Sequence, residues 1–150
     1  LANISWFGTP SMATVTIIVV SIWQNIGFLM IIYTAGLQTI PKDVMESAEL
    51  DGCSGLKKVL KIELPLLMPT VTINLFVSIS GAFKSFDIPN AMTGGGPYGS
   101  TMPVAMNIYQ EAFTKYNLGY GSAKSVILFL TVAAVTLIQL YCTRKKEVEY

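Results

Sequence analysis

Three long and predominantly apolar stretches without a charged residue constrain the fold of this chain more than any other feature. They are residues 1–41, the twenty residues between Glu63 and Lys84, and the nineteen residues between Lys124 and Arg144. Because an α-helix rises about 1.5 Å per residue, each stretch can cross the roughly 30 Å hydrocarbon core of a bilayer. We therefore predict an all-α fold: a polytopic membrane helix bundle with three transmembrane helices at about 13–38, 65–87 and 123–143.

Composition supports the membrane assignment and disfavours other classes. Only 13% of the 150 residues are charged, against about 25% in soluble domains. Three apolar, uncharged runs in so short a chain make the buried helices of a soluble protein a poor alternative. The net charge of +1 provides no field for binding nucleic acid, His is absent, and the two cysteines, Cys53 and Cys142, are far apart. We predict no catalytic residue, no metal site and no bound cofactor in this chain.

Lysine and arginine residues are distributed unevenly about the predicted transmembrane helices. Seven lie in the loop after the first helix or in the C-terminal tail: Lys42, Lys57, Lys58, Lys61, Arg144, Lys145 and Lys146. Three lie in or beside the segment between the second and third helices: Lys84, Lys115 and Lys124. The positive-inside rule then places residues 41–64 and 144–150 in the cytoplasm and residues 88–122 outside. Both cysteines would face the reducing side as free thiols.

The predicted cytoplasmic loop concentrates charge between two apolar stretches. Its pattern indicates a helix after Pro41 that ends at Gly52, in a turn that a side chain would resist. A second helix is expected from about Ser54 to Ile62. Pro65 and Pro69 should then start the next transmembrane helix, where missing N–H donors cost least. The loop is therefore predicted to be a helix–turn–helix beneath the membrane.

The predicted outer segment, 88–122, is too long for a plain turn. Apolar residues recur at helical spacing from Val104 to Tyr116, which predicts an amphipathic helix along the outer membrane face. Lys84 and Asp87, three residues apart, could pair at the outer end of the second transmembrane helix. Pro89 is expected to end that helix.

The cytoplasmic loop also carries a spaced motif. It reads Glu46-Ser47-Ala48, three residues, Gly52, nine residues, then Ile62-x-Leu64-Pro65. This spacing resembles the EAA loop of the membrane permease subunits of bacterial ABC importers. The flanking sequences LQTIP (37–41), MTGGGPYGST (92–101) and IYQEAF (108–113) resemble the carbohydrate branch, the maltose and glycerol-phosphate permease class. The departures are Ser47 for the second Ala of the motif, Cys53 for a commoner Ala, and Val59 for a frequent aromatic residue.

The resemblance implies a multi-pass permease subunit of an ATP-driven, binding-protein-dependent importer of a sugar or related carbohydrate, in the bacterial inner membrane. Such subunits are longer, so this chain, which begins at Leu1 rather than Met, is expected to be the C-terminal half. The implied partners are a cytoplasmic ABC ATPase dimer that holds ATP and Mg, a second permease subunit, an extracytoplasmic solute-binding protein and the lipid bilayer. The chain has no phosphate-binding G-x-x-x-x-G-K-[ST] run, so it is not expected to be an enzyme itself.

The resemblance also assigns residues to docking. Those implied for the ATPase contact are Glu46, Ser47, Ala48, Asp51, Gly52, Ile62, Leu64 and Pro65. Ser47 and Ala48 would allow close approach, and Glu46 would offer a charge to an Arg or Lys of the ATPase. The candidates for contact with the solute-binding protein are Gly95, Gly96, Pro97 and Tyr109. Simple coverage of the bundle mouth is the alternative for this outer group.

Polar residues inside the predicted transmembrane helices are candidates for the solute pathway, since such groups tend to face a bundle interior or water. They are Gln24, Asn25, Asn74, Ser78, Lys84 and Asp87. Hydrogen bonding between helices is the alternative. Two other functions also stay open. An importer permease for another solute class would share the EAA loop, whereas a secondary transporter would need no docking helix pair.

Overall fold

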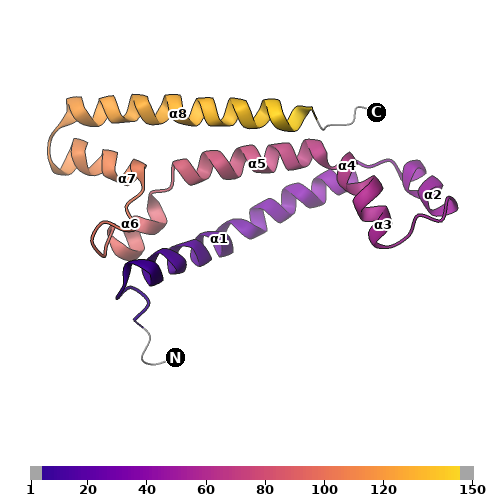
Figure 1. The fold of residues 1–150 in the computed structure, drawn as a ribbon, viewed down its shortest axis with the longest axis horizontal. Helices are drawn as coiled ribbons and strands as arrows, with labels where there is room; N and C mark the ends of the chain where they lie inside the picture. Colours follow the sequence, from indigo (N-terminus) through magenta and orange to yellow (C-terminus); the bar gives the residue numbers. More distant parts are fainter. Residues whose placement is uncertain (1–4, 146–150) are drawn as a thin grey trace. The chain divides into compact units, whose positions relative to one another are not determined.

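The computed structural model describes residues 5–145, and all regular structure in that range is helical (Figure 1). The predicted all-α fold is thereby confirmed. The helices are α1 (Pro10–Gln38), α2 (Lys42–Leu50), α3 (Leu56–Lys58), η1 (Val59–Glu63), α4 (Leu64–Leu66), α5 (Met68–Phe83), α6 (Asp87–Thr93), α7 (Val104–Tyr109), η2 (Gln110–Thr114) and α8 (Leu118–Arg144), where η1 and η2 are π-helical turns. Lys146, predicted to lie in the cytoplasmic tail, is outside the described residues.

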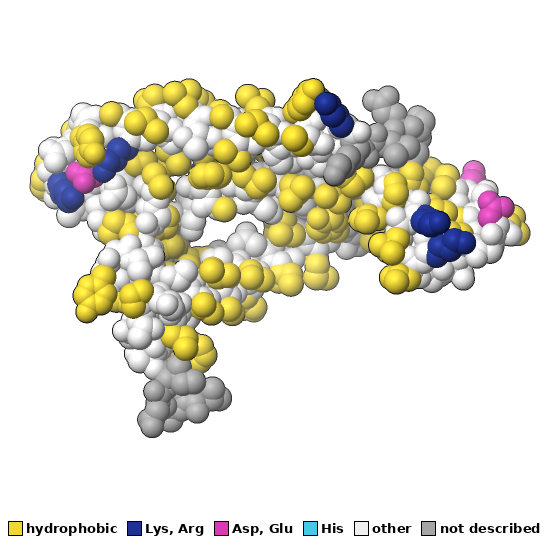
Figure 2. Space-filling model, in the orientation of Figure 1, with side chains coloured by type: hydrophobic (Ala, Val, Ile, Leu, Met, Phe, Trp, Pro, Cys, Tyr) yellow, Lys and Arg dark blue, Asp and Glu magenta, His cyan; other side chains and the backbone are white. Residues whose placement is uncertain are grey.

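Two helices are long and apolar enough to cross a membrane. α1 has 29 residues and α8 has 27, and they contain the predicted spans 13–38 and 123–143. α1 begins at Pro10, whose missing N–H is harmless in a first turn, and the preceding Thr9 hydroxyl accepts a 3.4 Å hydrogen bond from the Met12 N–H. Many large apolar side chains of both helices are exposed, and the face drawn in Figure 2 shows apolar side chains along them, which suits a lipid environment.

The second predicted span, 65–87, is not one continuous helix. The helical run Leu56–Leu66 and helix α5 meet at Leu67 and are bent by 69°. Pro69 has no N–H to donate to the carbonyl of Pro65, four residues earlier, and its ring crowds that carbonyl. The two prolines expected to start one straight span therefore stand on either side of a bend.

The outer end of this span also differs from the prediction. α5 ends at Phe83, and Pro89 lies in the first turn of α6 rather than at the end of the span. Lys84 and Asp87 consequently do not share a helix. No ion pair joins them among the described residues, so the predicted pairing is wrong for this structure.

The chain forms two compact units, and the long helices contribute to both. The first contains residues up to Ile26 with Ile79–Val135, and the second contains Gly27–Ser78 with the residues from Thr136 onward. Within the first unit, a Cβ on Gly121 of α8 would lie 2.8 Å from the Cβ of Ala112 in η2. Within the second, a Cβ on Gly36 of α1 would overlap the side chain of Thr70 in α5. Glycine at both positions lets neighbouring backbones approach closely.

Candidate functional site

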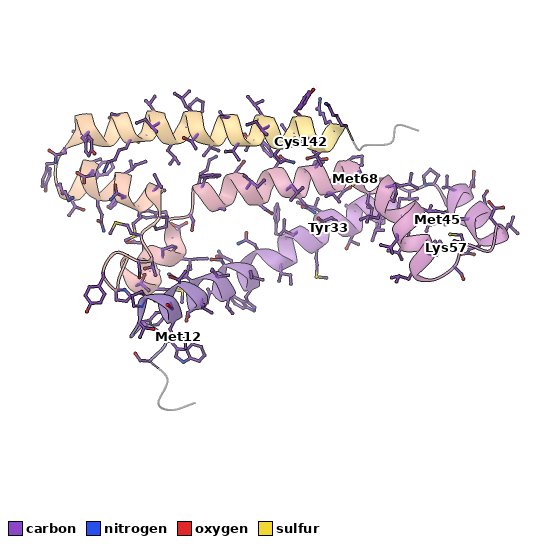
Figure 3. All side chains as sticks on the ribbon, viewed as in Figure 1. Met12, Tyr33, Met45, Lys57, Met68 and Cys142 are labelled. Atoms are coloured by element: carbon purple, nitrogen blue, oxygen red, sulfur yellow. The ribbon has the colours of Figure 1, made fainter. Side chains whose placement is uncertain are left out.

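The predicted cytoplasmic loop folds as two short helical arms joined by a tight turn, and we call residues 41–66 the hook (Figure 1). The first arm is α2, and the second is the continuous run of α3, η1 and α4. Figure 3 marks the arms by Met45 and Lys57. The hook belongs entirely to the second unit. The predicted helix–turn–helix is therefore present.

Gly52 closes the first arm in the way the sequence predicts. Its φ of +72° is in the left-handed region, which a residue with a Cβ resists. The Gly52 N–H donates to the Glu49 carbonyl at 3.0 Å, and the Cys53 N–H donates to the Ala48 carbonyl at 2.9 Å. These two bonds define a Schellman motif, which satisfies carbonyls that a helix end would otherwise leave unpaired.

A salt bridge fixes the two arms against each other. The Lys58 ammonium lies 2.6 Å from a Glu49 carboxylate oxygen, nine residues away in the sequence. The hydrogen bond from Lys58 lowers the pKa of Glu49, and the same bond raises the pKa of Lys58. Both groups therefore stay charged across the physiological pH range.

The outer face of α2 presents a mixed charged and apolar surface. Glu46, Ser47 and Leu50 are exposed, and Leu50 keeps 89% of its surface accessible. Glu46 and Leu50 are four residues apart and share one helical face. Leu56, at the start of the second arm, is 74% exposed. The sequence prediction missed both leucines, although isolated apolar residues within a charged run are a usable signal for a contact surface.

Ala48, which the resemblance assigns to close approach with the ATPase, is buried in the hook. It is only 5% exposed and lies, with the buried Cys53, at the turn between the two arms (residues 48–55), which we call the elbow. Apolar contact between these two positions commonly accompanies a Schellman motif. Ala48 therefore helps to close the hook in this structure, while Ser47 beside it remains at the surface.

The remaining motif residues divide between the turn and the second arm. Asp51 caps the C-terminus of α2 and is exposed. Ile62 lies in η1, and Leu64 and Pro65 form α4, immediately before the bend at Leu67. Their placement suits a joint between the hook and α5.

The candidates for the solute pathway fall into both units. In the first unit, Gln24 and Asn25 are exposed on α1, and the Asn25 amide donates 2.8 Å to the Ser21 carbonyl of its own helix. Lys84 and Asp87 are exposed at the turn between α5 and α6. In the second unit, Ser78 is exposed on α5.

Asn74, in the second unit, is unusual. It is 3% exposed, and neither its amide nitrogen nor its amide oxygen has a hydrogen-bond partner within the described residues. A buried amide without partners costs about 1–3 kcal/mol. Asn74 is one helical turn after Thr70, which faces Gly36 of α1, so it lies on the face of α5 that packs against α1. It is the candidate whose polar atoms are most in need of a partner.

The outer loop between α6 and α7 is closed by its two threonines. The Thr93 and Thr101 hydroxyls are 2.7 Å apart, and Thr101 also donates 2.6 Å to the Gly96 carbonyl. Gly95 has a φ of +90° and is buried. Because it is buried, it is not accessible to a solute-binding protein in this conformation. The adjacent Tyr98 is 97% exposed at the loop surface and was not among the predicted residues.

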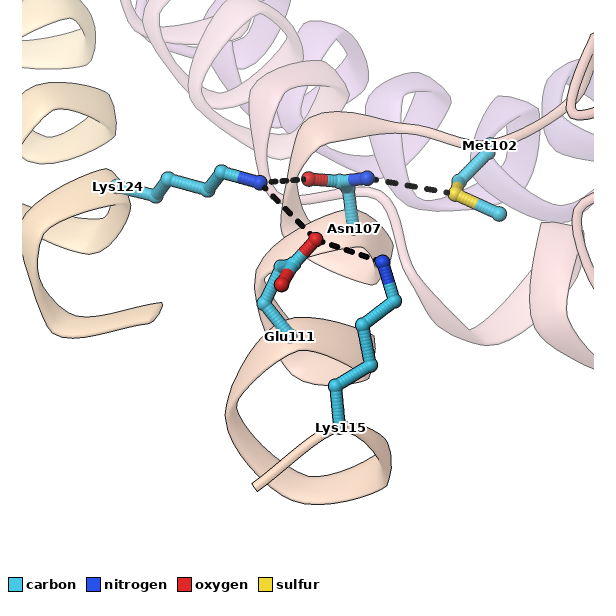
Figure 4. A network of polar contacts seen from close by, with 5 residues as sticks. All are labelled: Met102, Asn107, Glu111, Lys115 and Lys124. Carbon is cyan, nitrogen blue, oxygen red and sulfur yellow. Dashed lines mark hydrogen bonds and ion pairs between the residues drawn. The ribbon is translucent and has the colours of Figure 1, made fainter. Parts of the chain in front are cut away.

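A network of ionic and polar contacts joins α7 and η2 to α8 within the first unit (Figure 4). The largely buried Glu111 carboxylate lies 2.8 Å from the Lys115 ammonium and 3.6 Å from the Lys124 ammonium. Lys124 also donates 2.7 Å to the side-chain oxygen of Asn107. The hydrogen bond from Lys115 lowers the pKa of Glu111, so this carboxylate is ionised at neutral pH. Tyr109 stands on the same helical segment, in edge contact with Phe86.

Comparison with known proteins gives a consistent result. A family model described as binding-protein-dependent transport system inner membrane component matches residues 1–148. The chain is 38% identical over 144 residues to a probable starch degradation products transport system permease protein, AmyD, of Thermoanaerobacterium thermosulfurigenes, which covers 96% of this chain and 49% of the relative. It is 40% identical over 145 residues to the sulfoquinovosyl glycerol transport system permease protein SmoG of Agrobacterium fabrum, covering 97% of this chain and 47% of SmoG.

A third relative points in the same direction. The sn-glycerol-3-phosphate transport system permease protein UgpA of Agrobacterium fabrum is 36% identical over 135 residues, which cover 89% of this chain and 46% of UgpA. The chain thus spans about half the length of these relatives. Because the family model matches almost every residue, and because α1 and α8 can each cross a membrane, this chain belongs to the family of inner membrane components of binding-protein-dependent transport systems.

Proposed function

We propose that this chain contributes to the transmembrane permease subunit of an ATP-driven, binding-protein-dependent importer for a carbohydrate or related solute, and that its hook docks on a cytoplasmic ATPase. The observation that carries the proposal is the exposed face of α2. It presents Glu46 and Leu50 together on a hook whose angle is fixed by Gly52 and by the Lys58–Glu49 salt bridge.

The physical case for docking rests on Leu50 and Leu56. Both large apolar side chains are exposed in a charged loop, where a partner could cover them. Burying one leucine stabilises a contact by about 1.5–3 kcal/mol, which corresponds to roughly 10- to 100-fold in affinity. Glu46 beside Leu50 can pair with a basic residue at the rim of that contact. Movement of the ATPase would then reach α5 through the joint at Leu67.

The test uses the full-length permease assembled with its ATPase and solute-binding protein. Leu50→Ser should lower the affinity for the ATPase by roughly 10- to 100-fold. Glu46→Lys and Gly52→Pro should abolish transport-coupled ATP hydrolysis while membrane insertion persists. Val44→Ser is the matched control, because Val44 lies on the opposite face of the same helix. Normal coupled activity in all three hook variants would refute the docking role.

For the solute, the carbohydrate class is supported by the relatives, whose names refer to starch degradation products, sulfoquinovosyl glycerol and sn-glycerol-3-phosphate. Gln24 and Asn74 are the groups we propose to act in the pathway, together with the other polar candidates. Gln24→Leu and Asn74→Leu should reduce uptake of the solute without reducing membrane insertion. If uptake is unchanged in both, these amides serve helix packing alone.

A further inference from the structure

The second unit contains a groove between α5 and α8 that the proposed function does not use. Pro69, Thr72, Ile73, Phe76, Leu140 and Arg144 line an open pocket of about 350 Å³, which we call the α5–α8 groove. The start of α5, marked by Met68, and the end of α8, marked by Cys142, lie side by side in Figure 3. A hydrogen bond joins the two helices: the Gln139 side-chain amide donates to the Thr72 carbonyl oxygen at 3.4 Å. The groove is therefore a feature of packed helices rather than a gap between loose segments.

The groove is apolar along its length and basic at one end. Arg144 is the last residue of α8, and Leu140 lies about one helical turn before it. On α5, Phe76 lies about two turns after Met68, the residue at which that helix begins. Lys145 follows Arg144, and its ammonium lies 4.3 Å from the centre of the Tyr141 ring. Within residues 5–145, no carboxylate forms an ion pair with either basic side chain.

We propose that the α5–α8 groove binds an anionic phospholipid of the cytoplasmic leaflet, with the lipid phosphate on Arg144 and Lys145 and an acyl chain along Ile73, Phe76 and Leu140. Arginine matches phosphate oxygens with paired N–H donors, and basic pockets between transmembrane helices on the cytoplasmic side are suited to anionic headgroups. An apolar channel that runs from a cationic end toward the bilayer centre has the same polarity profile as a phospholipid. A peptide segment would need backbone hydrogen-bond partners, which apolar walls do not offer.

The inference rests on the proposed orientation, with the hook and the end of α8 in the cytoplasm. The binding step itself is independent of ATPase docking, since the groove residues and the exposed face of α2 are different side chains. A failure of one proposal can thus be told apart from a failure of the other by measuring lipid preference and ATPase affinity on the same samples.

The experiment measures the relative association of labelled phosphatidylglycerol and phosphatidylcholine with the full-length permease, assembled with its partners and reconstituted in vesicles. Removing one basic contact should lower the preference for phosphatidylglycerol by about 5-fold. Arg144→Gln with Lys145→Gln should therefore lose most of it. Arg144→Lys, which keeps the charge but not the paired N–H donors, should retain part of it. Ile73→Trp, which fills the groove without changing any charge, should also lower it. Lys57→Gln with Lys61→Gln removes equal charge from the hook and should leave the preference unchanged.

Three results would overturn the inference. If the hook pair lowers the preference as much as the Arg144 and Lys145 pair, general surface charge accounts for the effect. If Ile73→Trp has no effect although the charge variants do, no acyl chain enters the groove. If none of the variants changes the preference, another part of the assembled transporter covers the groove. In each case the affinity for the ATPase, which Leu50→Ser should lower and the groove variants should not, would still report on the docking role.

Discussion

Replacement of Gly52 by alanine isolates the contribution of one backbone conformation to the hook. At a φ of +72°, an L-residue costs about 1–2 kcal/mol relative to glycine. A Cβ at this position would meet no atom within 4 Å, so no steric clash adds to that cost. The expected effect of Gly52→Ala is therefore purely conformational. It should raise the population of the opened elbow by about 5- to 30-fold.

Hydrogen exchange of the amides in the elbow measures this opening directly. The Cys53 N–H, bonded to the Ala48 carbonyl at 2.9 Å, is the reporter. Its exchange should accelerate by about 5- to 30-fold in Gly52→Ala and by less in Gly52→Asn, because asparagine tolerates the left-handed region better. Gly119→Ala is the control, since Gly119 has ordinary helical geometry and equal free space. Unchanged exchange in Gly52→Ala, or an equal increase in the control, would contradict a conformational role for Gly52.

Three further predictions concern packing, ionisation and orientation. Gly36→Val should lower the melting temperature of the purified permease, because overpacking against Thr70 costs about 1–3 kcal/mol. Gly27→Val, in an open part of the same helix, should not lower it. Equal effects of the two variants would exclude a tight contact at Gly36. Glu111→Gln should destabilise the outer segment. Because the pKa of Glu111 is lowered in the folded chain, its contribution to stability is complete above the ordinary carboxylate pKa and is lost as the pH falls through the lowered value. The difference in melting temperature between the original chain and Glu111→Gln should therefore hold at neutral pH and disappear in acid. A difference that persists in acid would contradict the ionic explanation. Leu50→Cys should react with an impermeant thiol reagent only from the cytoplasmic side. It is a better reporter than Cys53, which is 8% exposed. Labelling of Leu50→Cys in intact cells would show that the hook lies outside.

The sequence alone determined the features that depend on local pattern. Predominantly apolar, uncharged runs of nineteen residues or more predict membrane-crossing helices because lipid offers no partner for charge, and α1 and α8 appear where two of these runs lie. Gly52 could be assigned to a turn because the left-handed conformation favours one residue type regardless of what surrounds it. The motif spacing likewise indicated the family, because it needs only the order of residues along the chain.

Tertiary packing sets which side chains are available for contact with a partner. Ala48 and Ser47 are adjacent in the sequence, yet one is buried in the elbow and the other exposed, because exposure depends on where the second arm packs. The Glu111–Lys124 and Thr93–Thr101 contacts join residues thirteen and eight positions apart, which no helical or strand periodicity brings together. Asn74 is buried with an amide that has no partner among the described residues, a state that depends on the packing of neighbouring helices. Such features follow from packing between distant segments, which local propensity does not encode.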